Sequence, residues 1–282
     1  MDNIGIIINN IKDANGVILN KVKSKIKNTF PNSDILILHQ FDHQDKKHIK
    51  NLSLLVVLGG DGTLLGVARD VLKYIKAPIL GVNIGNLGFL SSVECDEIDI
   101  ALSELKKGNY KIEPRMMLNC TIEGEEWFSS NALNDIVVAK GTLSRMVKYR
   151  IYVDNNYYAS FKGDGVIVST PTGSTAYSFS AGGPLIYPSL ELISIVPICS
   201  HTPNVRPIIL NANSSIDILA ENLGETMYLT IDGQKSISLK KKTNVKITKS
   251  VVKCEIVVFN NKNYFSVLRK KILDTKKECE GD

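Results

Sequence analysis

The sequence predicts two domains, an N-terminal doubly wound α/β domain and a C-terminal β-rich domain of mostly antiparallel strands, with a sandwich-like arrangement. Three observations support this fold class. The chain has 282 residues, more than one compact domain usually holds. Up to about residue 113, short apolar runs alternate with helical patterns, which is typical of a parallel sheet covered by helices. Beyond that point apolar residues recur at every second position, which is typical of antiparallel strands.

In the first domain, four apolar runs are expected to be buried strands: 4–9, 34–40, 52–59 and 78–83. Apolar residues at helical spacing predict helices over 16–30 and 64–76. Residues 96–108 predict another amphipathic helix that ends at Gly108, because glycine adopts the left-handed conformation of a helix C-cap without strain. The order strand, helix, strand favours a parallel, doubly wound sheet.

In the second domain, two alternating patterns predict β-hairpins. Residues 149–161 alternate around an Asn155-Asn156 turn, and residues 227–239 alternate around Asp232-Gly233. Further strands are expected at 215–220, 244–250 and 254–260, and a helix at 266–278. We therefore expect one domain over 1–113 and another over 114–263, with the terminal stretch 264–282 packed back on the first.

Composition excludes several classes of protein. The net charge is +5 and the lysines are scattered, whereas nucleic-acid binders concentrate them, so no nucleic-acid partner is expected. No segment approaches the roughly 20 apolar residues that cross a bilayer, so no membrane association is expected. The five cysteines are far apart and form no C-x-x-C pair, which favours a reducing compartment over disulfides or structural zinc. With no charged leader at the start, we expect a cytoplasmic protein.

The loop "GGDGT", from Gly59 to Thr63, follows an apolar strand and precedes a helix. Such a turn points backbone N–H groups and the positive end of a helix dipole at one place, which suits phosphate. The residues that would supply this backbone include Gly59, Gly60 and Thr63. A carboxylate beside phosphate makes sense where it receives the proton of an attacking hydroxyl. Asp61 is therefore the candidate catalytic residue for phosphoryl transfer to an alcohol. The alternative is that Asp61 only caps the helix.

The stretch "GDGVIVSTPTGSTAYSFSAGGP", residues 163–184, surrounds a short apolar strand with hydroxyl groups. This density of hydroxyls and exposed amides suits a polar ligand such as a nucleoside. Thr172 belongs to this series. Asn86 and Phe89, in "GNLGFL", are further candidates for the nucleotide, although the same segment would also serve as a loop anchor.

Together these motifs resemble those of the NAD kinase family, over almost the whole chain. The resemblance rests on "GGDGTLL" (59–65), "GNLGFL" (85–90), "NDIVV" (134–138), "GDGVIVSTPTGSTAYSFSAGGPL" (163–185), "ICSHTPNVRPIIL" (198–210) and "DGQ" (232–234). It implies transfer of the γ-phosphoryl group of ATP to the 2′-hydroxyl of the adenosine ribose of NAD. It also implies a homo-oligomer, commonly a tetramer, and a divalent cation. We expect magnesium to arrive with the ATP phosphates, because no carboxylate cluster offers a metal site.

The resemblance also implies roles for individual residues. Asp61 corresponds to the proton acceptor, with Gly62 beside it at the NAD, and Asn134 and Asp135 to a pair that binds the adenosine. Gln234 closes the site from its hairpin, unless Asp232-Gly233 is only a turn. Further NAD contacts are implied at Arg145, Lys162, Asp164, Thr175, Ala176, Tyr177, Ser178, Phe179 and Ser180.

Three positions depart from the family pattern: Asp135 where Glu is usual, Lys162 where Arg is common, and Ile84 where a small, polar or basic residue is usual. None of them affects Asp61. Two other functions stay open from the residues alone. One is a lipid kinase that shares the GGDGT loop, although no large apolar stretch is available for an acyl chain. The other is a non-catalytic sensor of NADP(H), which would have no use for Asp61.

Overall fold

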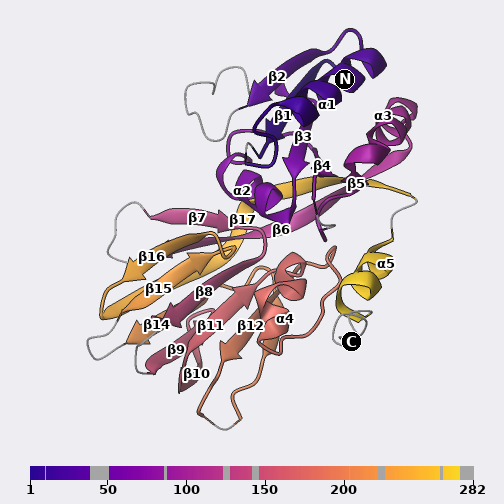
Figure 1. Ribbon diagram of the computed structural model, residues 1–282. Helices are drawn as coiled ribbons and strands as arrows, with labels where there is room; N and C mark the ends of the chain where they lie inside the picture. Colours follow the sequence, from indigo (N-terminus) through magenta and orange to yellow (C-terminus); the bar gives the residue numbers. More distant parts are fainter. Residues whose placement is uncertain are drawn as a thin grey trace, which may run out of the picture. The chain divides into compact units, whose positions relative to one another are not determined.

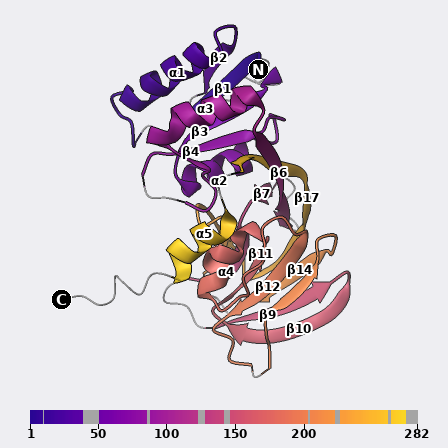
Figure 2. The ribbon, with the colours of Figure 1, turned by 90° about the vertical axis from the view of Figure 1, so that its right-hand side faces the viewer.

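The structure is a computed structural model that describes residues 1–9, 11–38, 51–85, 88–122, 128–141, 146–202, 204–221, 226–260 and 263–273. The chain forms two compact units, and Figures 1 and 2 show its elements in two views. Unit 1 comprises Met1–Val67, Val71–Glu113 and the chain from Glu255 onward. Unit 2 comprises Ala68–Asp70 and Pro114–Cys254. Each unit has its own hydrophobic core.

Unit 1 is built on a parallel sheet. Its strands are β1 (Asn3–Ile8), β2 (Asp34–Leu38), β3 (Leu54–Gly59), β4 (Ile79–Asn83) and β5 (Val93–Glu94), together with the end of β17 (Lys242–Phe259). They lie in the order β17-β4-β3-β1-β2, with β5 beside β4, and the pairs are parallel. Three of the predicted apolar runs, which form β1, β3 and β4, are buried on both faces, as expected for strands covered by helices. The run expected at 34–40 forms β2, which is only partly buried because it lies at the end of the strand order, and residues 39–40 lie outside the described residues.

Helices cover both faces of this sheet. The helices α1 (Val17–Thr29) and α3 (Ile98–Lys107) lie side by side on one face, as Figures 1 and 2 show. Ile26 and Leu102 there share one apolar cluster with Leu58 of the sheet. On the other face, Leu64 of α2 (Asp61–Asp70) lies against Gly81 of β4. A short 3-10 turn, η3 (Cys95–Glu97), precedes α3. The doubly wound fold predicted for this part is confirmed.

The helix ends follow from local hydrogen bonding. Asp13 accepts hydrogen bonds from the backbone N–H groups of Ile18 and Leu19, which would otherwise be unpaired in the first turn of α1. Gly108 ends α3 in the left-handed conformation, with φ 77°, as the sequence predicted. The short helix α5 (Tyr264–Leu268) and the π-helical turn η5 (Arg269–Leu273) follow β17.

Unit 2 is a sandwich of antiparallel layers, which confirms the predicted fold class. One layer has the order β13-β12-β11-β8-β15-β16 and the other contains β10-β9-β14-β17, with β6 and β7 joined to it. The strands are β6 (Tyr110–Ile122), β7 (Ser129–Ala132), β8 (Asp135–Lys140), β9 (Val147–Val153), β10 (Asn156–Gly163), β11 (Gly165–Ser169), β12 (Leu192–Ile198), β13 (Ile208–Asn211), β14 (Ile216–Glu221), β15 (Met227–Ile231) and β16 (Lys235–Leu239). One core cluster, including Tyr149 and Val166, draws side chains from both layers.

The helix expected over 64–76 is α2, which ends at Asp70, and two local predictions in unit 2 were wrong. The turn between β9 and β10 is Asp154-Asn155, one residue earlier than predicted, and both residues have positive φ, 50° and 64°. The Asp154 carboxylate stabilises this turn by accepting a hydrogen bond of 2.8 Å from the Ser215 N–H. The predicted strands 244–250 and 254–260 form the single strand β17, because the residues between them include no turn former.

Within the described residues, no helix is long and apolar enough to span a membrane. The cysteines in the same part of the chain, Cys95, Cys120, Cys199 and Cys254, are free.

The packing of α1 predicts that shortening one of its buried side chains lowers the stability of the protein considerably. Ile26 is fully buried, so Ile26→Ala should destabilise the protein by about 2–5 kcal/mol and lower its thermal unfolding midpoint, measured by circular dichroism. Ile100 on α3 is 63% exposed, and Ile100→Ala should change stability by only about 0.5 kcal/mol. Equal losses in the two variants would contradict this packing.

Candidate functional site

The GGDGT loop forms the expected strand-to-helix turn in unit 1. Gly59 is the last residue of β3, Gly60 caps the helix, and α2 begins at Asp61. The backbone N–H of Thr63 donates to the Gly60 carbonyl over 3.0 Å, which closes the first turn. Gly62 lies between them in that turn. The positive end of the α2 dipole therefore lies at the carboxyl end of β3, where an anion is stabilised.

Asp61 does not act as the N-cap of α2. Its carboxylate accepts hydrogen bonds from the backbone N–H groups of Phe89, over 2.7 Å, and Leu90, over 3.1 Å. The carboxylate lies so close to Gly88 that a Cβ there would overlap it. Only glycine at this position leaves room for Asp61. The GGDGT loop and the segment after β4 are thus held together through this one side chain.

The turn after β1 also reaches the GGDGT loop. Asn9 accepts a hydrogen bond from the Ile11 N–H and donates one from its side chain to Thr63 Oγ1, over 3.4 Å. The Lys12 ammonium nitrogen lies 2.8 Å from the position that a Cβ of Gly85 would occupy and 3.6 Å from that of Gly60. A cation therefore lies against both glycine-containing loops of unit 1.

In unit 2, Asp232 organises the segment that carries Asn134 and Asp135. Its carboxylate accepts hydrogen bonds from three successive backbone N–H groups, those of Leu133, Asn134 and Asp135, at 3.2, 2.8 and 3.2 Å. The Asp232 N–H donates to the Asp135 carbonyl over 2.9 Å. Asp232 is therefore more than a turn residue, because it fixes the backbone at the start of β8.

The same segment is hydrogen-bonded to the hydroxyl-rich stretch 163–184, the polar loop. The Asn134 carbonyl accepts a hydrogen bond from the Thr170 N–H, and Thr170 Oγ1 donates to the Leu133 carbonyl over 2.6 Å. A Cβ on Gly173 would overlap the Asn134 backbone, so glycine is required for this approach. The 3-10 turn η4 (Thr172–Thr175) and the short helix α4 (Tyr177–Ser180) follow from there. Asp232, the Asn134 segment and the polar loop thus form one hydrogen-bonded assembly.

Some side chains of the polar loop are buried or hydrogen-bonded within the protein, and others are exposed to solvent. Thr172 is buried and accepts a long hydrogen bond from Arg115, and Thr175 donates to the Thr172 carbonyl. Ala176 links η4 to α4. Tyr177 and Phe179 are 46% and 40% exposed, and Ser180 is also exposed. Ser178 is fully buried. The exposed side chains of Tyr177, Phe179 and Ser180 are therefore available to a ligand.

Burial and neighbouring charges raise the pKa values of Asp135, Asp232 and Tyr177. Burial raises the pKa of Asp135 to about 7, and the Asp232 charge adds to the rise. Burial also raises the pKa of Asp232 to about 6, although the three backbone donors and Arg69 act in the opposite direction. Partial burial raises the pKa of Tyr177, and the nearby charges of Asp135 and Asp164 contribute.

The remaining predicted residues of unit 2 lie around this assembly. Asp164 forms an ion pair of 3.0 Å with Lys140. Lys162 is exposed on β10, and its carbonyl accepts a hydrogen bond from the His201 N–H. The Gln234 side chain accepts a hydrogen bond of 2.9 Å from Arg69. Asn86 and Arg145 lie outside the described residues.

Three features of this region were not predicted from the sequence. They are the contacts of Asn9 and Lys12 with the GGDGT loop and the three hydrogen bonds that the Asp232 carboxylate accepts. Asn9 follows β1 directly and Lys12 comes three residues later, at the carboxyl edge of a parallel sheet, where ligands of α/β proteins bind. That rule, applied to every strand, would have identified them. The role of Asp232 depends on a pairing with residues almost a hundred positions away, and no local pattern signals it.

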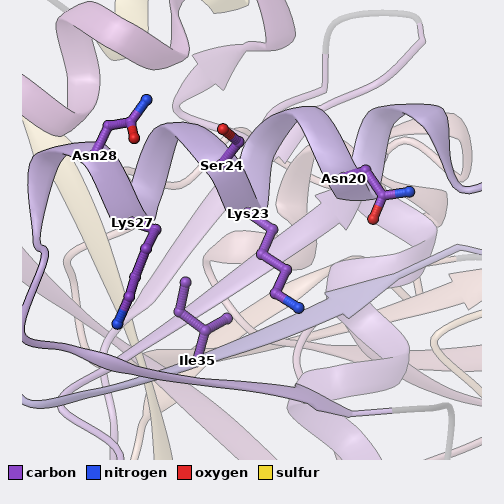
Figure 3. A pocket seen from close by; sticks show the side chains of 6 residues that line it. All are labelled: Asn20, Lys23, Ser24, Lys27, Asn28 and Ile35. Atoms are coloured by element: carbon purple, nitrogen blue, oxygen red, sulfur yellow. The ribbon is translucent and has the colours of Figure 1, made fainter.

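A hollow of about 480 Å³ between α1 and β2 is a separate feature (Figure 3). Its lining residues are Asn20, Lys23, Ser24, Lys27, Asn28 and Ile35. Figure 3 shows the lysine side chains extending from the helix past Ile35. The Lys27 ammonium group donates to the Ser33 carbonyl over 2.9 Å. None of the predicted site residues lines this hollow.

Comparison with known proteins identifies two matching family models. The ATP-NAD kinase N-terminal domain matches residues 4–110, and the ATP-NAD kinase C-terminal domain matches residues 133–259. The NAD kinase of Clostridium beijerinckii is 54% identical over 283 residues, which cover 100% of this chain and 99% of that protein. The NAD kinase of Clostridium perfringens strain 13 is 54% identical over 272 residues, covering 96% and 99%.

Two solved structures share the fold. Yeast NADH kinase complexed with NADH aligns with a TM-score of 0.81 at 25% identity, over 98% of this chain and 88% of that one. An NAD kinase from Archaeoglobus fulgidus in complex with ATP aligns with a TM-score of 0.74 at 24% identity, over 96% and 98%. The second likeness concerns the fold alone.

The raised pKa of Asp135 predicts a pH-dependent stability. A carboxyl group whose pKa is raised by folding to about 7 stabilises the folded state when protonated, and this contribution is lost as the pH rises from about 4 through 7. Relative to wild type, Asp135→Asn should therefore gain thermal stability as the pH rises over that range. Differential scanning calorimetry without substrates measures it, with the exposed Asp34→Asn as control. A difference that does not change with pH would contradict the assignment.

Proposed function

The chain belongs to the NAD kinase family, and from this premise we propose how its residues divide the transfer of a phosphoryl group from ATP to NAD. The ribose 2′-hydroxyl oxygen attacks the γ-phosphorus of ATP, the bond from that phosphorus to the β–γ bridging oxygen breaks, and ADP leaves. The hydroxyl proton goes to the Asp61 carboxylate.

The observation that carries this proposal is the position of the Asp61 carboxylate. It lies in the first turn of α2, where the helix dipole favours phosphate, and two backbone N–H groups fix its orientation. A carboxylate held in this way needs no reorientation to receive a proton. Gly59, Gly60, Gly62 and Thr63 present backbone to the phosphates, and Phe89 stays beside them through the hydrogen bond to Asp61.

The adenosine part of NAD is proposed to bind in unit 2. Asn134 and Asp135 are proposed to contact it, because the Asp232 carboxylate accepts hydrogen bonds from their backbone N–H groups and so fixes their orientation. The exposed rings of Tyr177 and Phe179 offer apolar faces to a base, and the polar groups of the loop offer hydrogen bonds. Lys162, Asp164 and Gln234 are proposed as further NAD contacts, as the family resemblance implies.

Magnesium is proposed to enter with ATP, as part of that substrate. Among the described residues, no group of three or more His, Cys, Asp or Glu side chains is close enough to hold a metal ion. The carboxylate nearest to the proposed phosphate site, Asp61, already accepts two backbone hydrogen bonds. When bound, the ion would neutralise phosphate charge.

Assembly and location are proposed from the sequence alone. The homo-oligomer, commonly a tetramer, that the family resemblance implies stays a prediction, which light scattering of the purified protein would check. The cytoplasmic location expected from the cysteine content also stays a prediction.

If Asp61 is the proton acceptor, Asp61→Asn should lose turnover while it keeps its affinities for ATP and NAD. Loss of a general base costs about 10²–10⁴-fold in kcat, while the remaining side-chain oxygen can still accept one of the two backbone hydrogen bonds. Turnover is measured by coupling NADP formation to an NADP-specific dehydrogenase, and the affinities for ATP and NAD by calorimetry.

The matched control is Asp34→Asn, which removes an exposed carboxylate of unit 1 on β2. It should leave kcat and both affinities unchanged. If Asp61→Asn kept near-wild-type kcat, Asp61 would not be the proton acceptor. If it lost ATP affinity to the same degree as kcat, the side chain would act by positioning the loop.

A further inference from the structure

We propose that Lys12 binds the phosphates of ATP at the GGDGT loop. Lys12 belongs to none of the motifs identified in the sequence. This inference rests on the proposed function, because it takes that loop as the place where the phosphates bind. It adds a substrate-binding residue to the site, from the turn that follows β1.

The turn after β1 lies at the topological switch point of the unit 1 sheet. In the order β4-β3-β1-β2, the chain passes from β1 to β2 on one side and then returns to β3 on the other. Ligands of open α/β sheets bind outside the carboxyl ends of the strands at such a point. Lys12 follows the carboxyl end of β1, and the GGDGT loop follows the carboxyl end of β3.

Hydrogen bonds hold this turn in a defined conformation. The Lys12 N–H donates to the Asn9 carbonyl over 2.9 Å, and the Ile11 N–H donates to Asn9 Oδ1 over 3.0 Å. The Asn9 side chain also contacts Thr63 of the GGDGT loop, over 3.4 Å. The backbone of Lys12 is therefore fixed relative to the proposed phosphate site, and its position does not depend on its own side chain.

The ammonium group lies where glycines leave room for it. It is 2.8 Å from the position of a Cβ on Gly85 and 3.6 Å from that of a Cβ on Gly60. In the part of the chain that the structure describes, no ion pair occupies Lys12. The Asp61 carboxylate is instead occupied by the N–H groups of Phe89 and Leu90. The charge of Lys12 is thus available to an anion.

The site needs such a cation. The GGDGT loop carries one negative side chain and no positive one, and residues 83–85 and 88–90 carry no basic residue either, with the apolar Ile84 between Asn83 and Gly85. Catalysis of phosphoryl transfer depends largely on stabilising the negative charge of the phosphates. A lysine beside the nucleotide supplies the stabilising positive charge as a point charge. Lys12 brings such a charge to Gly60 and Gly85, whereas Lys271, another lysine near these loops, lies over the ring of Phe89, 6.0 Å from its centroid.

The test compares Lys12→Met, Lys12→Arg and Lys21→Met. Lys12→Met keeps most of the side-chain length but removes the charge, and hydrogen bonds to charged groups imply about a 10- to 100-fold weaker affinity for ATP and a similar loss in kcat/KM for ATP. NAD affinity should stay at the wild-type value. Lys12→Arg retains a cation and should lose less. Lys21 is an exposed lysine of α1, so Lys21→Met should behave as wild type. Calorimetry measures both affinities.

Two results would overturn the proposal. Unchanged ATP affinity in Lys12→Met would show that the ammonium group does not bind the phosphates. A parallel loss of ATP affinity, NAD affinity and thermal stability in both Lys12 variants would assign Lys12 a structural role. Asp61→Asn, measured beside them, separates this from failure of the proposed function. If Asp61→Asn loses turnover while Lys12→Met keeps its ATP affinity, only the role of Lys12 fails.

Discussion

Each unit is organised around one interaction, an aspartate carboxylate that accepts consecutive backbone N–H groups from a remote segment. In unit 1, Asp61 binds residues 28 and 29 positions away in the sequence, and in unit 2 Asp232 binds residues 97 to 99 positions away. Hydrogen bonds to a charged acceptor are about twice as strong as neutral ones. Loops that would otherwise be held only at their ends are therefore fixed in the middle, which preorganises the groups they carry.

This arrangement has an electrostatic consequence in unit 2. The Asp232 carboxylate is buried to make its three hydrogen bonds, and its charge lies near Asp135, whose pKa is raised to about 7. Buried like charges resist joint ionisation. A positively charged or hydrogen-bond-donating ligand at Asp135 would relieve this cost. The charge of Asp135 therefore changes near neutral pH in the folded protein, because burial and the Asp232 charge raise its pKa to about 7.

Much of the fold could be predicted from the sequence, because buried parallel strands and hairpins leave local patterns. The strand at 52–59, the C-cap at Gly108 and the hairpin at Asp232-Gly233 are examples. The Asn155-Asn156 turn was misplaced because Asp154 tolerates a left-handed conformation equally well and gains a hydrogen bond from distant Ser215. The GGDGT turn could be predicted because its motif is contiguous. The partners of Asp61 and Asp232, and the position of the Lys12 ammonium group, could not, since they depend on how separate segments pack.

The glycines of these loops have a physical explanation that composition alone conceals. Glycine-rich loops are usually explained by backbone freedom or by close approach of a ligand. In this protein Gly88 is required by the Asp61 carboxylate and Gly173 by the Asn134 backbone, before any ligand binds. Gly85 likewise gives space to the Lys12 ammonium group. The glycines thus allow one carboxylate and one ammonium group to lie directly against backbone at the same edge of the unit 1 sheet. Under the proposed function, these opposite charges act on the two ends of a phosphoryl transfer, the Asp61 carboxylate as proton acceptor for the attacking hydroxyl and the Lys12 ammonium group as a cation for the phosphates.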